Sequence, residues 1–194
     1  TRRSSDLIRK NRWDRAILSG MEPTPAGVRS TNEQTDHYFV LSALDSGMED
    51  CKWGRLKFSL QLEENSVFYL YAAASNDLEA GEGLFEEQAS FAGRKAHFSR
   101  LSGVRFINQS DVLLYGLEGR YLWIGAELIG TGASVSDMKV LVPGDNFMQV
   151  FPEVYRERNS FFHRYISVYS SLYNDFQEQI DQRDQLYDIA SAKR

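Results

Sequence analysis

The spacing of apolar residues changes once along this chain of 194 residues, at Pro143-Gly144. Before that point apolar residues come in short runs bounded by turn residues, which is typical of β-strands, and after it they recur at helical spacing. The fold class expected from this change is α+β, an antiparallel β-sandwich followed by a long C-terminal α-helix, with an irregular N-terminal arm. The expected strands are His37–Leu44, Arg55–Leu62, Val67–Ala74, Val104–Ile107, Val112–Leu117, Tyr121–Ile129 and Met138–Val142.

Two of these runs predict that the strands form two layers. In Arg55–Leu62 apolar and polar residues alternate strictly, so one face of the strand meets a core and the other meets water. In Val67–Ala74 both the odd and the even positions are apolar, which predicts a strand covered on both sides. Because no helical spacing separates the strands, an antiparallel sandwich is favoured over a parallel α/β sheet. The segment Glu79–Ser99 is expected to be a long loop or a short helix laid across the sandwich.

Three regions are expected along the chain: residues 1–33 as an arm, 34–143 as the sandwich domain, and 144–194 as a linker followed by the helix. Pro23, Pro25 and Gly27 would interrupt any helix in the first region. Residues 1–15 hold six basic and two acidic groups, in a chain whose net charge is -5. Because an acidic body repels phosphate backbones and the basic stretch has no series of stacking aromatics, nucleic acid is not expected as a partner.

The C-terminal region predicts an amphipathic helix whose apolar face is unusually wide and aromatic. Asn159 or Ser160 can cap its start, and neither Gly nor Pro interrupts it through Ile189, so at least six turns are expected. Such a face has to dock on something, and we favour helices of other chains or of sequence missing from this one. The alternative is that the helix folds back over its own sandwich. At 100° per residue, the side chains that fall within an arc of about 160° are Phe161, Phe162, Tyr165, Ile166, Val168, Tyr169, Leu172, Tyr173, Phe176 and Ile180.

No local pattern in the sequence indicates catalysis. His37, His97 and His163 lie in different regions without metal-ligand spacing, and there is no phosphate-binding glycine loop or nucleophile elbow. The lone Cys51 cannot form an internal disulfide and is interpreted as a small buried hydrophobe. We therefore expect no enzyme activity, no cofactor and no metal. The longest apolar run, Val67–Ala74, is far short of the roughly 20 residues of a membrane span.

Several stretches of the sequence resemble bacterial phage-tail-like proteins. Two segments, Leu44–Gly47 and Cys51–Leu56, look like the opening of a sandwich domain of these proteins. Three more, Gly119–Ile124, Glu127–Gly132 and Val140–Pro143, look like the strand pair that closes it. Phe151–Arg156 and the following Phe161–Ile180 resemble the signature of the tail protein I family. In that signature a leucine-proline-x-x-tyrosine-arginine motif precedes a helix rich in phenylalanine and leucine. Together these segments are spread over residues 44–180.

This resemblance implies a baseplate wedge subunit of a contractile phage tail or contractile injection system, present in many copies. Such proteins are not enzymes. They use long helices to join other wedge subunits in a bundle near the central spike, and hub, spike or sheath proteins are further expected partners. The implied location is the bacterial cytoplasm during assembly and then the particle itself. The chain departs from the family at Phe151, where leucine is usual, and at Arg194, where members normally continue into a further helical domain; a partial or split protein is therefore expected.

The residues of the expected interface are Phe161, Phe162, Tyr165, Tyr169, Leu172, Tyr173, Phe176 and Ile180. A rival hypothesis is a carbohydrate-binding or adhesive sandwich, in which Trp53, Tyr69, Tyr71 or Trp123 would stack on sugar rings. The two hypotheses are distinguished by whether these four aromatics line an open face or the core. An enzyme is a third, weaker hypothesis, kept because catalytic residues need not form local motifs.

Overall fold

A computed structural model gives the fold of this chain, which divides into two compact units, Thr1–Val142 and Pro143–Arg194. The residues whose structure is described are 13, 15–31, 37–87, 89–114, 116–130 and 132–140 in the first unit, and 162, 165, 166, 168–170, 172, 173, 175–177, 179 and 180 in the second.

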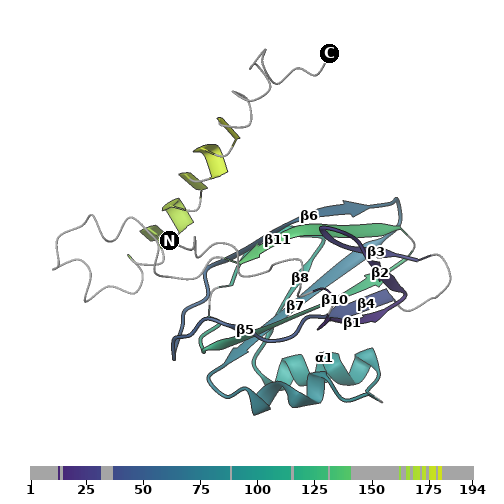
Figure 1. The fold of residues 1–194 in the computed structure, drawn as a ribbon, viewed down its shortest axis with the longest axis horizontal. Coiled ribbons are helices and arrows are strands. Elements are labelled where there is room, and N and C mark those ends of the chain that lie inside the picture. Colours follow the sequence, from purple (N-terminus) through teal and green to yellow (C-terminus); the bar gives the residue numbers. More distant parts are fainter. Residues whose placement is uncertain are drawn as a thin grey trace. The chain divides into compact units, whose positions relative to one another are not determined.

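The first unit is an antiparallel β-sandwich (Figure 1), as the sequence predicts. Its six-stranded sheet has the order β1-β4-β10-β7-β8, with β5 also paired to β10, and its five-stranded sheet has the order β2-β3-β11-β6-β9. The strands are β1 (Ile17–Ser19), β2 (Met21–Pro23), β3 (Gly27–Ser30), β4 (His37–Val40), β5 (Leu44–Asp45), β6 (Arg55–Leu62), β7 (Val67–Ser75), β8 (Val104–Ile107), β9 (Asp111–Leu113), β10 (Tyr121–Ile129) and β11 (Ala133–Val140).

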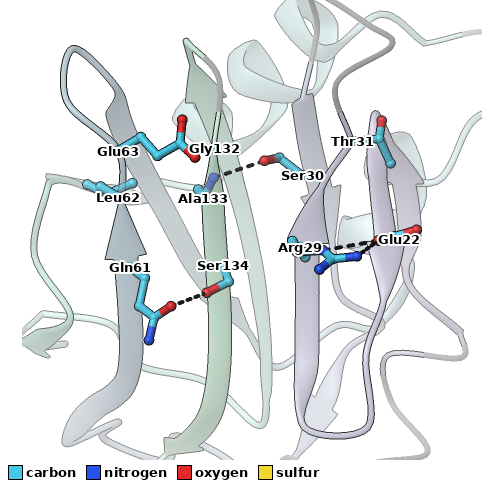
Figure 2. Close-up of a pocket in the computed structure, with 10 residues that line it drawn as sticks. All are labelled: Glu22, Arg29, Ser30, Thr31, Gln61, Leu62, Glu63, Gly132, Ala133 and Ser134. Atoms are coloured by element: carbon cyan, nitrogen blue, oxygen red, sulfur yellow. Dashed lines mark hydrogen bonds and ion pairs between the residues drawn. The ribbon is translucent and has the colours of Figure 1, made fainter.

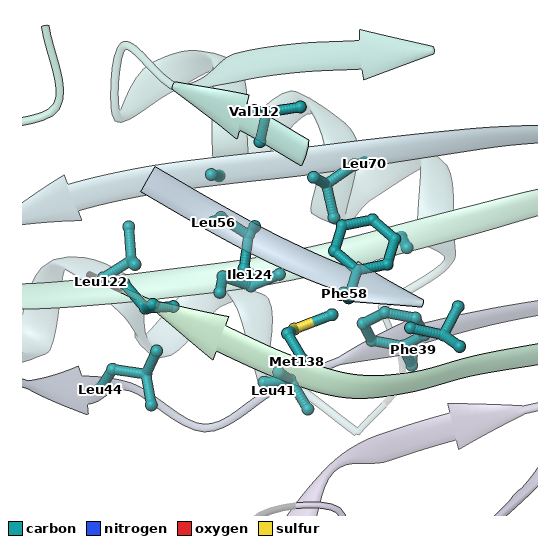
Figure 3. Close-up of a cluster of buried hydrophobic side chains, with 14 of the residues drawn as sticks. Phe39, Leu41, Leu44, Leu56, Phe58, Leu70, Val112, Leu122, Ile124 and Met138 are labelled. Carbon is teal, nitrogen blue, oxygen red and sulfur yellow. The ribbon is translucent and has the colours of Figure 1, made fainter. Parts of the chain in front are cut away.

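The core lies between the two sheets (Figure 3) and follows from the alternation of the strands. Leu56 and Phe58 of β6 enter this core from one sheet, while Leu70 of β7 and Ile124 of β10 enter it from the other. On the opposite face of β6, Ser59 and Gln61 are exposed. The strict alternation of this segment therefore placed one face in the core and the other in water, as expected.

A second apolar layer covers the outer face of the six-stranded sheet. Tyr71 and Ala73 of β7 point into it, together with Trp123 of β10, whereas the neighbouring Leu70 and Ala72 of β7 belong to the main core. The prediction that this strand is covered on both sides is thus confirmed. The cover is a 3-10 helix, η2 (Glu79–Leu84), followed by a helix, α1 (Phe91–Arg100), so the expected short helix across the sandwich is present (Figure 1).

Helix α1 is held in place by a cap and by a buried cation. The Ser90 side chain accepts a hydrogen bond from the Gly93 amide at 3.2 Å, which satisfies one of the unpaired donors at the helix start. The guanidinium of Arg94, buried in the same helix, donates to the carbonyl oxygens of Leu84 at 2.8 Å and Glu86 at 2.9 Å. These bonds tie the loop between η2 and α1 to the helix itself.

The described part of the expected N-terminal arm differs from the expectation, because residues 17–30 form three strands of the sandwich. Gly20, at a positive φ of 59°, lets the chain pass from the edge of one sheet to the edge of the other. Pro23 ends the edge strand β2, where a missing amide hydrogen does no harm. A Cβ at Gly27 would lie 1.8 Å from the Val135 carbonyl oxygen, so glycine is needed there for β3 to approach β11. Two residues interpreted as helix breakers therefore lie in strands: Pro23 ends the edge strand β2, and Gly27 lets β3 pack closely on β11.

The strand boundaries agree with the sequence in part. Arg55–Leu62, Val104–Ile107 and Tyr121–Ile129 are strands with the expected bounds. The last strand, however, begins at Ala133 rather than Met138, and its register against β6 shifts between Ser136 and Lys139. Serines and this irregularity conceal the alternation, which explains why the sequence pattern missed the first half of the strand.

The long C-terminal helix remains a prediction. The described residues between Phe162 and Ile180 are helical, but a continuous helix of six turns is not established, because intervening residues and those from 181 on lie outside the described set. Phe161, the expected caps Asn159 and Ser160, and the Phe151–Arg156 motif also lie outside it.

Candidate functional site

The described helical residues of the second unit carry a stripe of exposed large apolar side chains, here named the aromatic ridge. Each is between 42% and 62% exposed. In one continuous helix, at 100° per residue, they would fall within an arc of about 100°, which is the width of one helix–helix contact face. The members of the ridge are Tyr165, Tyr169, Leu172, Tyr173, Phe176 and Ile180.

One side of the ridge is bounded by buried residues. Ile166 and Ser170, which are one turn apart, are 7% and 3% exposed, and the Ser170 hydroxyl donates to the Ile166 carbonyl oxygen at 2.8 Å. Phe162, which was expected in the interface, is partly buried. The expected interface is thus exposed at the six ridge positions and only partly so at Phe162, and Phe161 lies outside the described residues.

The ridge differs from the other exposed apolar residues by being concentrated in one short segment, Tyr165–Ile180. Elsewhere in the described chain the exposed large hydrophobics come from separate loops and strands: Met48, Leu78, Ile107, Leu113 and Ile129. Single residues of this kind are normal on a protein surface, whereas a contiguous apolar patch indicates an interaction site. The ridge is therefore the strongest candidate for a protein interface among the described residues.

The aromatics named for sugar stacking are not on an open face. Trp53, Tyr71 and Trp123 are buried, with exposures of 3%, 8% and 1%. The Trp53 indole donates to the Gly119 carbonyl oxygen at 2.8 Å, and Trp123 lies in the layer beneath η2 and α1. Tyr69 is partly buried, with the Arg105 guanidinium 5.6 Å from its ring centroid. The two-sided apolar pattern of Val67–Ala74 already predicted a covered strand for Tyr69 and Tyr71. The sequence could not reveal which elements cover Trp53 and Trp123.

Two of the three histidines have structural roles. His37 and His97 each pair through Nε2 with a backbone carbonyl oxygen at 2.7 Å, that of Thr31 and that of Ala80 respectively. His163 lies outside the described residues. Within the described part of the chain, no three His, Cys, Asp or Glu side chains converge on a position that could hold a metal ion. In that same part, no helix is long and apolar enough to cross a membrane.

The shifted ionisations of the sandwich do not prepare a nucleophile. Burial raises the pKa of the Cys51 thiol, and its hydrogen bond with Ser46 opposes this only in part. Burial also raises the pKa of Tyr71, helped by the charge of Glu127. Hydrogen bonding and charge from Asp45 raise the pKa of Arg120, which is already a cation. Each shift keeps its group in the form that it has at neutral pH.

A row of polar side chains across the five-stranded sheet was not identified from the sequence. The pairing register sets Glu22 beside Arg29, Arg29 beside Ser134, and Ser134 beside Gln61, on four successive strands. Strand alternation predicts that Gln61 faces outward, but not which residues lie beside it. Only the register of non-local pairing brings these four together.

Comparison with known proteins gives only a weak likeness. No protein-family model matches this chain, and no curated protein matches it. Among solved structures, the glycosylation associate protein (Gap123) complex from Streptococcus agalactiae is similar at a TM-score of 0.33 and 11% sequence identity. The match covers 66% of this chain and 24% of that chain, so this chain spans a minor part of its length. A likeness at this level carries no argument about function.

Proposed function

We propose that this chain is a structural component of a contractile phage tail-like injection system, a baseplate wedge subunit that joins other wedge subunits through the aromatic ridge. The observation that carries the proposal is the exposure of six large apolar side chains among the helical residues from Tyr165 to Ile180. The resemblance of Phe151–Arg156 and Phe161–Ile180 to the tail protein I family supports the particular assembly. We further propose that the described helical residues belong to one long helix.

The size of the ridge fits a stable interface. A buried phenylalanine removes about 200 Å² from water, so covering Phe176, which is 62% exposed, would remove about 120 Å² more. At about 25 cal/mol per Å² the hydrophobic contribution of this one residue is at most about 3 kcal/mol, and the entropy cost of association offsets part of it. The ridge therefore has the apolar area of a group of interface hot spots.

In this proposal the role of the chain is mechanical. The sandwich acts as a rigid spacer, because its core is closed by both sheets and by the α1 layer, and the ridge holds neighbouring subunits together. A wedge of this kind keeps a particle in its loaded state and transmits a rearrangement through repacked interfaces when the sheath contracts.

The test uses the full chain co-expressed with the other wedge subunits of its own particle. The double variant Tyr169→Asp and Phe176→Asp places two charges on the ridge and should abolish co-assembly, measured by size-exclusion chromatography of the complex and electron microscopy of the particles. Its sandwich should melt at the wild-type temperature. The matched control is Leu78→Asp with Ile129→Asp, two sandwich residues that are each 52% exposed.

Normal particles from the ridge variant would contradict the proposal. Equal loss of assembly in the control would contradict it as well, because the effect would then follow from any two surface charges rather than from the ridge.

A further inference from the structure

The outer face of the five-stranded sheet contains a polar hollow of about 830 Å³, which the ridge does not involve (Figure 2). The α1 layer covers only the other sheet. Four of the residues that line the hollow form the cross-strand row Glu22, Arg29, Ser134 and Gln61. A volume of this size is within the range of small-molecule sites.

The shape of the hollow follows from side-chain size along β11. Ser134 and Gly132 are short and form its floor, while longer side chains stand on both sides, Arg29 on β3 and Gln61 on β6. Gly132 has a positive φ of 80°, and a Cβ there would lie 2.0 Å from Cδ of Glu63. Only glycine therefore lets the Glu63 side chain lie across the end of this floor.

The side chains on each wall contact one another. The Arg29 Nε donates to Glu22 Oε1 at 3.1 Å, and the two side chains form an ion pair. On the other wall, the Ser134 hydroxyl donates to Gln61 Oε1 at 3.3 Å. Figure 2 shows these two pairs on either side of the hollow. These contacts lie on exposed side chains, so they favour one orientation of the polar groups without fixing it.

The chemistry of the lining narrows the class of ligand. The lining holds two carboxylates, one guanidinium, one carboxamide and several hydroxyls, while Leu62 and Ala133 are its apolar residues. Apolar ligands would gain little there. Anions would meet two carboxylates and a guanidinium already paired with one of them. A neutral ligand with many hydroxyl groups can both donate to the carboxylates and accept from the amide, hydroxyl and guanidinium groups.

We propose that this hollow binds a neutral oligosaccharide, whose hydroxyl groups donate to the Glu63 carboxylate and exchange hydrogen bonds with the Gln61 carboxamide and the Ser134 hydroxyl. No aromatic ring is among the residues described as lining it, so sugar stacking does not contribute and the affinity of one site is roughly millimolar. Many copies of the chain on one particle would raise the effective affinity for a glycan-coated surface. This activity is independent of the ridge and places a sugar at a different position from the four aromatics considered from the sequence.

The test is a titration of the ¹⁵N-labelled full chain with maltotriose, cellotriose and triacetylchitotriose, followed by amide NMR. At least one trisaccharide should shift the amides of Gln61, Glu63 and Ser134 saturably. The variants Gln61→Ala and Glu63→Gln should each weaken that binding about tenfold. The control Lys57→Ala lies on the same strand, outside the lining, and should leave the binding unchanged.

Three outcomes would overturn the proposal. In the first, none of the three trisaccharides shifts these amides. In the second, the shifts persist in both hollow variants, which would place the sugar elsewhere. In the third, spermidine or inorganic phosphate shifts the same amides while the sugars do not, which would assign the hollow to a cation or an anion. The amide spectrum of each variant also checks that its sandwich is folded.

Discussion

Replacing Arg94 by methionine tests how the α1 layer is held on the sandwich. The Arg94 side chain is 2% exposed, and its hydrogen-bond acceptors are the neutral carbonyl oxygens of Leu84, Glu86 and Ala89 and the Tyr38 hydroxyl. Its guanidinium also lies 5.5 Å from the centroid of the Tyr38 ring. Methionine fills a similar volume but offers none of these donors.

Two opposing effects decide the magnitude. Loss of the donors removes the Arg94 hydrogen bond from the buried Leu84 carbonyl, at a cost of about 1–3 kcal/mol. Loss of the hydrogen bonds to the carbonyls of Glu86 and Ala89, which lie nearer the surface, costs about 1 kcal/mol each. Removal of a buried charge offsets part of this, because methionine has no desolvation cost. We expect the free energy of unfolding to fall by about 2–4 kcal/mol, which in a unit of this size lowers Tm by roughly 5–15 °C.

The assay is urea unfolding followed by tryptophan fluorescence, since Trp53 and Trp123 are both buried. The midpoint should fall without a change of slope, which marks a loss of stability rather than of compactness. The matched control is Arg100→Met, the same substitution at an exposed position of the same helix, which should change stability by less than about 0.5 kcal/mol. If Arg94→Met is as stable as the control, or more stable than wild type, the reasoning is refuted, because the desolvation cost would then outweigh the hydrogen bonds.

Three smaller predictions concern the sandwich. Gly27→Ala should destabilise it by about 3 kcal/mol or more in urea unfolding, since the new methyl would collide with the Val135 carbonyl oxygen, and a wild-type midpoint would disprove the close approach. Gly93→Ala should raise stability by about 0.5–1 kcal/mol, because this helical position has room for a Cβ, and a loss of stability would count against that. Because burial raises the pKa of Cys51, its thiol should react with a disulfide reagent at pH 8 only slowly unless urea is added. Below the pKa of the unfolded thiol the shift leaves stability unchanged, and stability falls as the pH rises from that value through the raised folded pKa, because burial disfavours the thiolate.

Much of the sandwich could be predicted from local patterns. Neighbouring residues alone give the alternation of Arg55–Leu62, and in the fold one face of this strand is exposed to water. The same holds for the two-sided apolar pattern of Val67–Ala74, which is a strand covered on both faces. The apolar stripe from Tyr165 to Ile180 is also a local property, because it depends only on helical spacing.

Other features depended on which segments pair with which. Pro23 and Gly27 appear in the sequence as breakers, yet they end an edge strand and allow β3 to approach β11. Ser136 and the register shift that follows it concealed half of β11. Propensity scales describe single residues, so they are overruled where a neighbouring strand supplies the stabilising contacts.

By itself the sequence determined which residues share a strand face or a helix face, because side-chain direction repeats with a fixed period along each element. Only the tertiary structure decided which element covers each face and which residues meet across strands. It placed Trp53 and Trp123 in the core, and it set Glu22, Arg29, Ser134 and Gln61 side by side around a hollow. The physical reason is that burial and register arise from contacts between segments far apart in the chain, whose pairing no local period encodes.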